Sequence, residues 1–203
     1  MDLFTIWKQT MECLNCLEQK DMFDDLLLCY QEASRQYHTT QHLVSCFIHY
    51  EICQSKMKDP LVVALALFYH DVVYDVRRLD NEQMSAQAWQ RDGSRLGLSN
   101  ETIENVTGMI LATKNHKTED ADTQIFLDID LSILGEQDEV FDQFERDIRA
   151  EYVWVPEEIF RNRREQILRK FLERDQIFYT SSFCSFEQKA RKNLWRRIVE
   201  LGK

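Results

Sequence analysis

Two short blocks of the sequence carry the residue types that bind divalent metals. The first block, YHTTQH, contains His38 and His42, and the second, HDVVYD, contains His70, Asp71 and Asp75. Three of the five histidines of the chain fall in these two blocks. Imidazole and carboxylate ligands together suit a borderline transition metal such as Mn, Fe, Co, Ni or Zn, and they leave coordination positions for water. The two blocks therefore predict a metal centre.

The same residue types indicate hydrolysis as the chemistry. A metal of this kind lowers the pKa of a bound water to about 7, and it polarises a phosphoryl oxygen. His38 and His42 are one helical turn apart, so His38 faces the same pocket if His42 is a ligand. Because histidine titrates near physiological pH, His38 is a candidate to donate a proton to a leaving oxygen. Asp130, in the apolar segment FLDIDLSILG, would complete a set of two imidazoles and two carboxylates.

The segments that position these residues are expected to be helical. Only two prolines and five glycines occur in 203 residues, so long helices have few internal breakers. The segment 60–74 is apolar nearly all round and is expected to run through the middle of the fold, with Asp59 as its N-cap and Pro60 in its first turn. A carboxylate in such a segment is costly to bury, so Asp71 must be paired or must bind a metal.

Further helices are expected from the spacing of apolar residues, with the range 125–135 left as an apolar segment of undecided type. Their predicted ranges are 3–18, 22–34, 38–57, 81–96, about 100–114, 137–152, 156–174 and 184–201. The length of the chain favours one domain over two small ones.

Composition excludes several classes of partner. Asp and Glu outnumber Lys and Arg by 35 to 25, so a nucleic-acid polymer or an anionic membrane is not an expected partner. The longest apolar stretch, Leu61–Tyr69, is about half the length of a membrane span. The N-terminal residues lack the pattern of a secretion signal, so we expect a cytoplasmic protein whose six cysteines are free thiols. Apolar residues of the N-terminal helix are compatible with a homodimer.

The order of the metal-binding residues resembles a known family. His42, then His70 with Asp71, then Asp130 is similar to the H…HD…D signature of the HD-domain superfamily of metal-dependent phosphohydrolases. The blocks YHTTQH, LFYHDVVYD, NEQMSA, ATKNH and FLDIDLSILG together resemble its small group of predicted HD phosphohydrolases, over roughly residues 35–180. The resemblance implies an all-α, single-domain helical bundle over residues 1–203. In it, a metal-site core of about 35–135 is covered by C-terminal helices at 137–201.

The resemblance also implies roles for the ligand residues. His42, His70, Asp71 and Asp130 match the metal ligands, with Asp128 as the competing choice for the last position. His38 corresponds to the general acid of related cyclic-nucleotide phosphodiesterases, whose YHNxxH motif has Asn where this chain has Thr. Asp71 is expected to take part in catalysis as well as in metal binding.

Residues outside the ligand set are assigned to catalysis and substrate binding. Family members with two metals often carry a histidine shortly after the HD pair, where this chain has Asn81-Glu82. This departure argues against a second metal and leaves Glu82 as a catalytic residue that orients water. Lys114, in the ATKNH block, is expected to contact substrate phosphate, and His116 in the same block is expected to contact substrate phosphate or a second metal. Arg35, just before YHTTQH, is expected to reach the pocket rim and bind substrate.

These features predict a metal-dependent phosphohydrolase with one divalent transition metal. It is expected to cleave a phosphoester or phosphoanhydride of a small molecule, with a nucleotide as the expected substrate, by attack of a metal-bound water. The alternative is a catalytically weak HD domain that binds metal and nucleotide as a sensor or regulatory module. Turnover distinguishes the two, and neither the substrate nor the metal is specified by the sequence.

Overall fold

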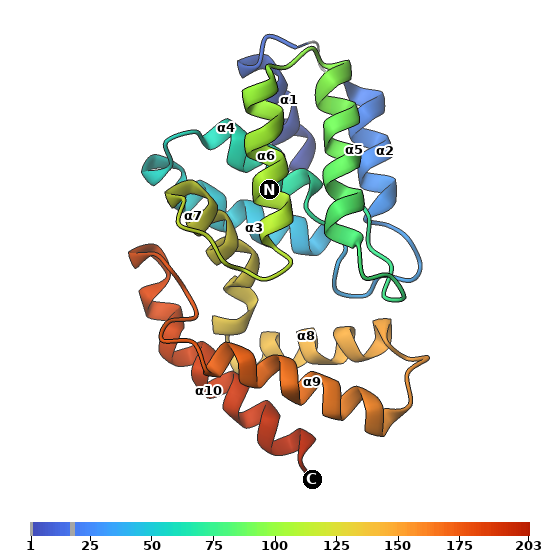
Figure 1. Cartoon of the computed structure of the whole chain (residues 1–203), viewed down its shortest axis with the longest axis vertical. Coiled ribbons are helices and arrows are strands. Elements are labelled where there is room, and N and C mark those ends of the chain that lie inside the picture. The colour runs from blue at the N-terminus through green and yellow to red at the C-terminus, as the bar shows by residue number, and fades with distance from the viewer. Residues whose placement is uncertain (1, 17–18) are drawn as a thin grey trace. The chain divides into compact units, whose positions relative to one another are not determined.

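The computed structural model describes residues 2–16 and 19–203, and across them it contains helices and no strand. The prediction of an all-α protein is therefore confirmed. The α-helices are α1 (Leu3–Cys13), α2 (Lys20–Cys29), α3 (Thr40–Cys53), α4 (Pro60–Tyr69), α5 (Asn81–Arg95), α6 (Asn100–Ala112), α7 (Ala121–Asp130), α8 (Asp138–Glu151), α9 (Glu157–Leu172) and α10 (Cys184–Leu201) (Figure 1). Short 3-10 helices lie at Gln54–Lys56, Leu131–Gly135 and Ser181–Phe183.

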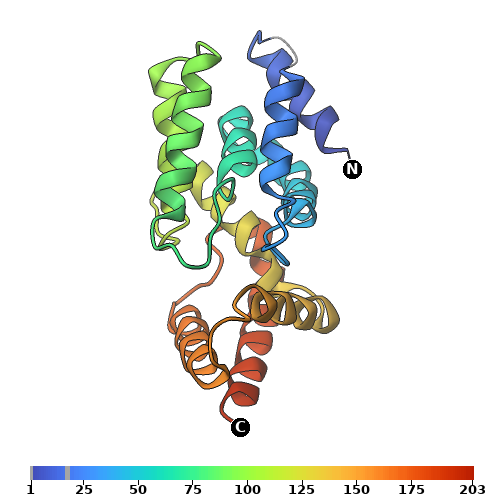
Figure 2. The ribbon, with the colours of Figure 1, turned by 90° about the vertical axis from the view of Figure 1, so that its right-hand side faces the viewer.

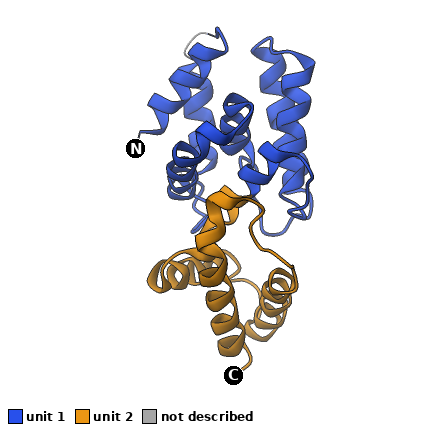
Figure 3. Ribbon diagram, turned by 90° about the vertical axis from the view of Figure 1, so that its left-hand side faces the viewer, with its two compact units in different colours: residues 1–127 blue, residues 128–203 orange. Residues whose placement is uncertain are grey.

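The chain divides into two compact units, residues 1–127 and 128–203 (Figure 3). The expectation of a single HD-type domain over residues 1–203 stays a prediction. Across the described residues, no helix combines the length and the apolar character needed to span a bilayer.

Helix α4 forms the centre of the first unit. The side chains of all residues from Val62 to Tyr69 are buried. Figure 2 shows α4 between the pair α5 and α6 on one side and the helices α1 and α2 on the other. On its α1 side, Phe68 meets the ring of Trp7 edge-on, with 5.2 Å between ring centroids. The prediction of a central apolar helix is confirmed, and its C-terminal end lies in the interior.

The predicted helices at the N-terminus end earlier than expected. Helix α1 ends at Cys13, and Asn15 adopts a left-handed backbone with φ of 55°. Asn tolerates this conformation, which stops a helix. Residues 17 and 18 of the predicted range 3–18 lie outside the described residues. Helix α2 ends at Cys29 rather than at residue 34, and the buried Tyr30 follows it.

The second unit is built from α8, α9, α10 and the 3-10 helix Leu131–Gly135. Helix α10 packs against α9 and against this 3-10 helix. The contact depends on Gly135, because a Cβ atom there would lie 2.5 Å from Cδ1 of Phe186. The buried carboxylate of Glu145 is held by ion pairs with Arg164 and, at 3.0 Å, with Arg197. These pairs join all three α-helices of the unit.

Candidate metal centre

The start of α3 and the end of α4 bring the side chains of two histidines and an aspartate close together. Helix α3 begins at Thr40 because the extended residue Thr39 caps it, its hydroxyl accepting from the backbone N–H of Gln41. His42 therefore lies in the first turn of α3. His70 is the C-cap of α4, and Asp71 follows it. Both histidines are buried, whereas the Asp71 side chain is 20% exposed.

The three side chains converge through single atoms. Nε2 of His42 lies 3.1 Å from Nε2 of His70, and Oδ2 of Asp71 lies 3.2 Å from Nε2 of His70 and 3.9 Å from Nε2 of His42. Two ligand atoms that bind one metal at about 2.0–2.2 Å lie about 2.9 Å apart at a right angle and about 3.4 Å apart at a tetrahedral angle. The two shorter distances fall within this range. The group could therefore hold a metal ion.

The tautomer of His70 supports the same conclusion. Nδ1 of His70 lies 2.8 Å from the carbonyl oxygen of Leu67. Because a carbonyl can only accept, we assign the proton to Nδ1, and in the neutral ring Nε2 then presents a lone pair. Histidines that bind metals almost always donate their other ring N–H to a carbonyl, a carboxylate or a water. The hydrogen bond to the Leu67 carbonyl thus fixes the His70 ring in the way that is usual for a histidine that binds a metal.

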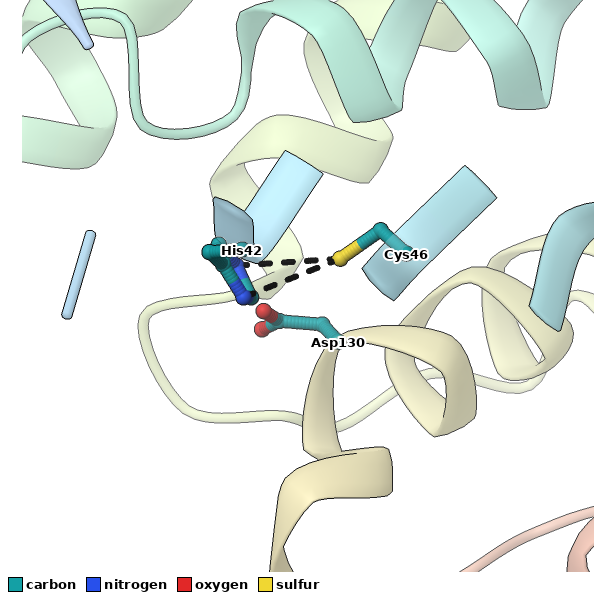
Figure 4. Close-up of side chains that lie close together, drawn as sticks. All are labelled: His42, Cys46 and Asp130. Atoms are coloured by element: carbon teal, nitrogen blue, oxygen red, sulfur yellow. Dashed lines mark hydrogen bonds between the residues drawn. The ribbon is translucent and has the colours of Figure 1, made fainter. Parts of the chain in front are cut away.

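Cys46 is a residue at this centre that the sequence did not single out. Its buried Sγ lies 3.7 Å from Nε2 and 3.8 Å from Nδ1 of His42. Figure 4 shows Cys46 one turn after His42 on α3, and Asp130 on the last turn of α7. All six cysteines are free, as predicted. The spacing of four residues from His42 is the signal in the sequence for Cys46.

Arg35 is buried, and backbone carbonyls take up its guanidinium. Its Nη1 donates to the carbonyl of Asp71 at 2.6 Å and to that of His38 at 3.4 Å, and Nη2 donates to the carbonyl of Val72 at 3.0 Å. Its Nε donates to the carboxylate of Glu32 at 3.1 Å. The sequence predicts Arg35 at a pocket rim, but only 3% of the residue is exposed in the structure. Its substrate-binding role stays a prediction, and the geometry favours an anchoring role.

His38 lies beside the predicted ligands. Its half-buried ring stacks on Tyr74, with 3.9 Å between centroids and 25° between planes, and lies 6.0 Å from the ring of His42. The stack holds the imidazole in one orientation. The proton-donor role of His38 stays a prediction.

The structure brings together two other predicted residues, Glu82 and Lys114. Glu82 lies in the first turn of α5, and its Oε2 is 3.7 Å from Nζ of Lys114. Lys114 also donates to the carbonyl of Leu79 at 3.0 Å and to Oε1 of Gln83 at 3.2 Å. Oε2 of Glu82 is buried and lacks a hydrogen-bond partner. The pair joins the end of α6 to the start of α5.

His116 follows α6 in a left-handed conformation, with φ of 52°. Its backbone N–H donates to the carbonyl of Ala112 at 2.8 Å and so closes the end of the helix. Its ring is half-buried. The predicted contacts of Lys114 and His116 with substrate stay predictions.

The two acids of FLDIDLSILG differ in their surroundings. The carboxylate of Asp128 is fully buried and accepts from the backbone N–H groups of Tyr179 and Thr180 and from the hydroxyl of Thr180, each at 2.7 Å. Burial raises the pKa of Asp128 to about 6, although these hydrogen bonds act in the opposite direction. Both of its oxygens are thus engaged with the loop before α10. Asp130, the last residue of α7, is half-buried, and this contrast favours Asp130 as the ligand.

Cavities in the described part of the first unit lie both away from the predicted site and next to it. A cavity of about 690 Å³ is lined by residues at the starts of α4 and α7 and along α6, which are not the predicted site residues. A second, of about 510 Å³, is lined partly by the segment that follows Asp71, including Val72, Tyr74 and Asp75. This second cavity therefore adjoins the backbone that carries Asp71.

Comparison with known proteins does not assign the chain to a family. No protein-family model matches the chain, and neither a curated protein nor a solved structure matches it. The HD-type resemblance is therefore carried by the sequence blocks. The capacity to hold a metal is carried by the geometry of His42, His70 and Asp71.

Proposed function

We propose that the protein is a metal-dependent phosphohydrolase of the HD type. The observation that supports this most is the convergence of the Nε2 atoms of His42 and His70, 3.1 Å apart, with Oδ2 of Asp71. The Leu67 carbonyl accepts from Nδ1 of His70 and so orients the ring with Nε2 toward the other ligand atoms. Two buried imidazoles and one part-exposed carboxylate, with their ligand atoms at the separations that a single ion requires, form a set that suits a divalent transition metal.

Asp130 is proposed as the fourth ligand. Its helix is tied to the start of α4, because the carboxylate of Asp122 accepts from the backbone N–H groups of Lys58 at 2.9 Å and Asp59 at 2.7 Å. One turn before Asp130 on the same helix, the ring of Phe126 lies 6.0 Å from the ring of His70, edge to face. The assignment of Asp130 rests on its place in the FLDIDLSILG block and on its half-buried side chain.

The remaining roles belong to residues of the chain around this centre. When bound, a divalent metal would supply Lewis-acid activation of water and of a phosphoryl oxygen. Protonated His38, held by its stack on Tyr74, would donate its proton to the leaving oxygen. The exposed ammonium of Lys114 and the ring of His116 would bind phosphate oxygens. Glu82 would orient water. The substrate that we propose is a small phosphorylated molecule, most simply a nucleotide.

The proposal is tested by metal content and turnover together. Purified protein is loaded in turn with Mn, Fe, Co, Ni or Zn, and its metal is counted by elemental analysis. Phosphate release is then measured over a panel of nucleotides and simple phosphoesters. We expect one metal per chain and turnover of at least one substrate, both lost in Asp71→Ala.

Asp75→Ala is the matched control for Asp71→Ala. Asp75 is exposed, lies four residues further along and accepts from the backbone N–H of Arg77 at 2.9 Å, so its loss should leave metal content unchanged. A protein that binds no metal from any of the five salts refutes the proposal. One that binds metal and nucleotide without turnover is instead a sensor of the kind considered above.

A further inference from the structure

We propose that Arg35 is a positioning residue that holds the two ligand-bearing segments of the metal centre in register. The inference rests on the metal centre of the proposed function and assigns to Arg35 a role other than substrate binding. It concerns the backbone that carries His42 and Asp71 rather than the ligand atoms themselves.

One guanidinium spans both segments. Nη1 of Arg35 donates to the carbonyl of His38, four residues before the ligand His42, and to that of Asp71, which is itself a ligand. Nη2 donates to the carbonyl of Val72. The start of α3 and the end of α4 are thus bonded to a single planar, rigid group. A shift of either segment would break at least one of these bonds.

Arg35 also completes the end of α4. The last turn of this helix contains no basic residue, and its apolar side chains cannot bond the carbonyls that follow. A cation at a helix C-terminus is favourable, and Arg35 places one against the two carbonyls just beyond the C-cap His70. Arg35, from a distant segment of the chain, therefore supplies the positive charge and the donors that the end of α4 lacks.

Aromatic rings fix the guanidinium from two positions. Its Cζ lies 5.2 Å from the ring centroid of Tyr30 and 5.7 Å from that of Tyr74. The buried hydroxyl of Tyr30 accepts from the backbone N–H of Asp71 at 3.3 Å and donates to the carbonyl of Phe68 at 3.0 Å. Tyr30 and Arg35 therefore hold Asp71 through its N–H and its carbonyl respectively. The backbone position of this ligand is determined on both sides.

Lysine could not replace this arrangement. Arginine offers five N–H donors in a fixed fork, whereas lysine offers a single point charge on a flexible stem. Arg35→Lys would keep the charge but lose the simultaneous bonds to the carbonyls of His38, Asp71 and Val72. We expect it to weaken metal affinity by about 10-fold to 100-fold, the range typical of residues that orient metal ligands.

The test measures metal binding directly, so it does not depend on turnover. The dissociation constant for Zn²⁺ is measured by competition with a chromophoric chelator, and the visible absorption of the Co²⁺-loaded protein reports coordination geometry. Arg35→Lys is expected to raise the dissociation constant and to change the Co²⁺ spectrum. Addition of methylguanidinium to Arg35→Ala is expected to restore part of the affinity, which a general loss of stability would not allow.

Arg149→Lys is the matched control. Arg149, in the second unit, also donates from Nε to a carboxylate, that of Glu157, and from its two Nη atoms to the carbonyls of Tyr152 and Val155. Its guanidinium likewise lies over an aromatic ring, that of Phe160, at 4.7 Å. Its replacement removes the same kinds of bond, with two carbonyl partners where Arg35 has three, and leaves the predicted ligands unchanged. We expect the Zn²⁺ affinity and the Co²⁺ spectrum of Arg149→Lys to match those of the wild type.

Each outcome decides the inference. Wild-type affinity and an unchanged Co²⁺ spectrum in Arg35→Lys overturn it, even if the protein proves to be a phosphohydrolase. A wild-type protein that binds no metal overturns the proposed function and this inference with it. If the Arg35 variants do not fold, Glu32→Gln decides, since it removes only the half-exposed carboxylate partner of Arg35. A loss of affinity of about two-fold to five-fold supports the inference, and none overturns it.

Discussion

Removal of the metal is expected to lower the melting temperature of the protein, because the folded chain gathers the ligand atoms that the unfolded chain keeps apart. Both histidines are at most 4% exposed, and their Nε2 atoms lie 3.1 Å apart. Oδ2 of Asp71 lies 3.2 Å from Nε2 of His70, so all three ligand atoms are already gathered in the folded chain. A metal that binds these atoms only in the folded chain stabilises the fold.

The size of the effect follows from mass action. At a free metal concentration 100 times the dissociation constant, binding stabilises the fold by about 2.7 kcal/mol. In a chain of about 200 residues, 1 kcal/mol shifts the melting temperature by roughly 2–4 °C. The metal-loaded protein should therefore melt about 5–11 °C above the chelated protein.

Asp71→Asn gives the matched perturbation for this assay, since it preserves size and removes the carboxylate charge. If it weakens binding about 100-fold, the same metal concentration only equals the dissociation constant and stabilises the variant by about 0.4 kcal/mol. Differential scanning calorimetry of wild type, Asp71→Asn and Asp75→Asn, each with and without chelator, measures the difference. Asp75→Asn should keep the full shift.

A small shift of the melting temperature in the metal-saturated protein would contradict a stabilising role of the ion. If elemental analysis shows one bound metal and chelation still moves the melting temperature by less than about 2 °C, the ion contributes under 1 kcal/mol. An equal shift in wild type and Asp71→Asn would likewise remove Asp71 from the ligand set.

Two further predictions concern the second unit. The pKa of Asp128 is raised to about 6, so the folded chain binds this proton more tightly than the unfolded chain, and the resulting stability is present below about pH 4 and lost as pH rises through 6. Urea denaturation from pH 4 to 7 should show the stability of wild type falling by up to about 3 kcal/mol relative to Asp128→Asn, and parallel curves would contradict the assignment. Gly135→Ala should destabilise by about 1–3 kcal/mol, because its Cβ would lie 2.5 Å from Phe186. Gly108→Ala, with no atom within 4 Å of the new Cβ, should instead stabilise α6 by about 0.5–1 kcal/mol, and equal effects of the two substitutions in urea would refute the steric argument.

The central helix was largely predictable because local chemistry specifies it. Asp59 accepts from the backbone N–H of Val62 at 3.2 Å, and Pro60 occupies the first turn, as the sequence indicated. The end was less predictable, since α4 stops at Tyr69 and the predicted range continued to residue 74. Nothing in the local sequence marks this end, because the groups that bond it, from Arg35 and Tyr30, are more than 30 residues away.

The metal centre was predictable in part for a similar reason. His42, His70 and Asp71 were chosen by residue type and order, and the structure brings them together. The position of Arg35 just before YHTTQH predicts a place at the pocket rim, whereas its partners in the structure include backbone carbonyls, which every residue carries. The engagement of Asp128 could not be foreseen either, since it depends on backbone groups about 50 residues away.

The end of α4 has a consequence for how such a centre can be altered. If the helix continued, the backbone N–H of Asp71 would donate to the carbonyl of Leu67, four residues earlier. In this protein that N–H donates to the hydroxyl of Tyr30, and the Leu67 carbonyl accepts from the imidazole of His70. The end of the helix at Tyr69 thus leaves the Leu67 carbonyl to the imidazole and the Asp71 N–H to Tyr30. A change that extends α4 by one residue would move the Asp71 N–H from Tyr30 to Leu67, and so would shift the backbone of a ligand while every side chain of the centre stayed the same.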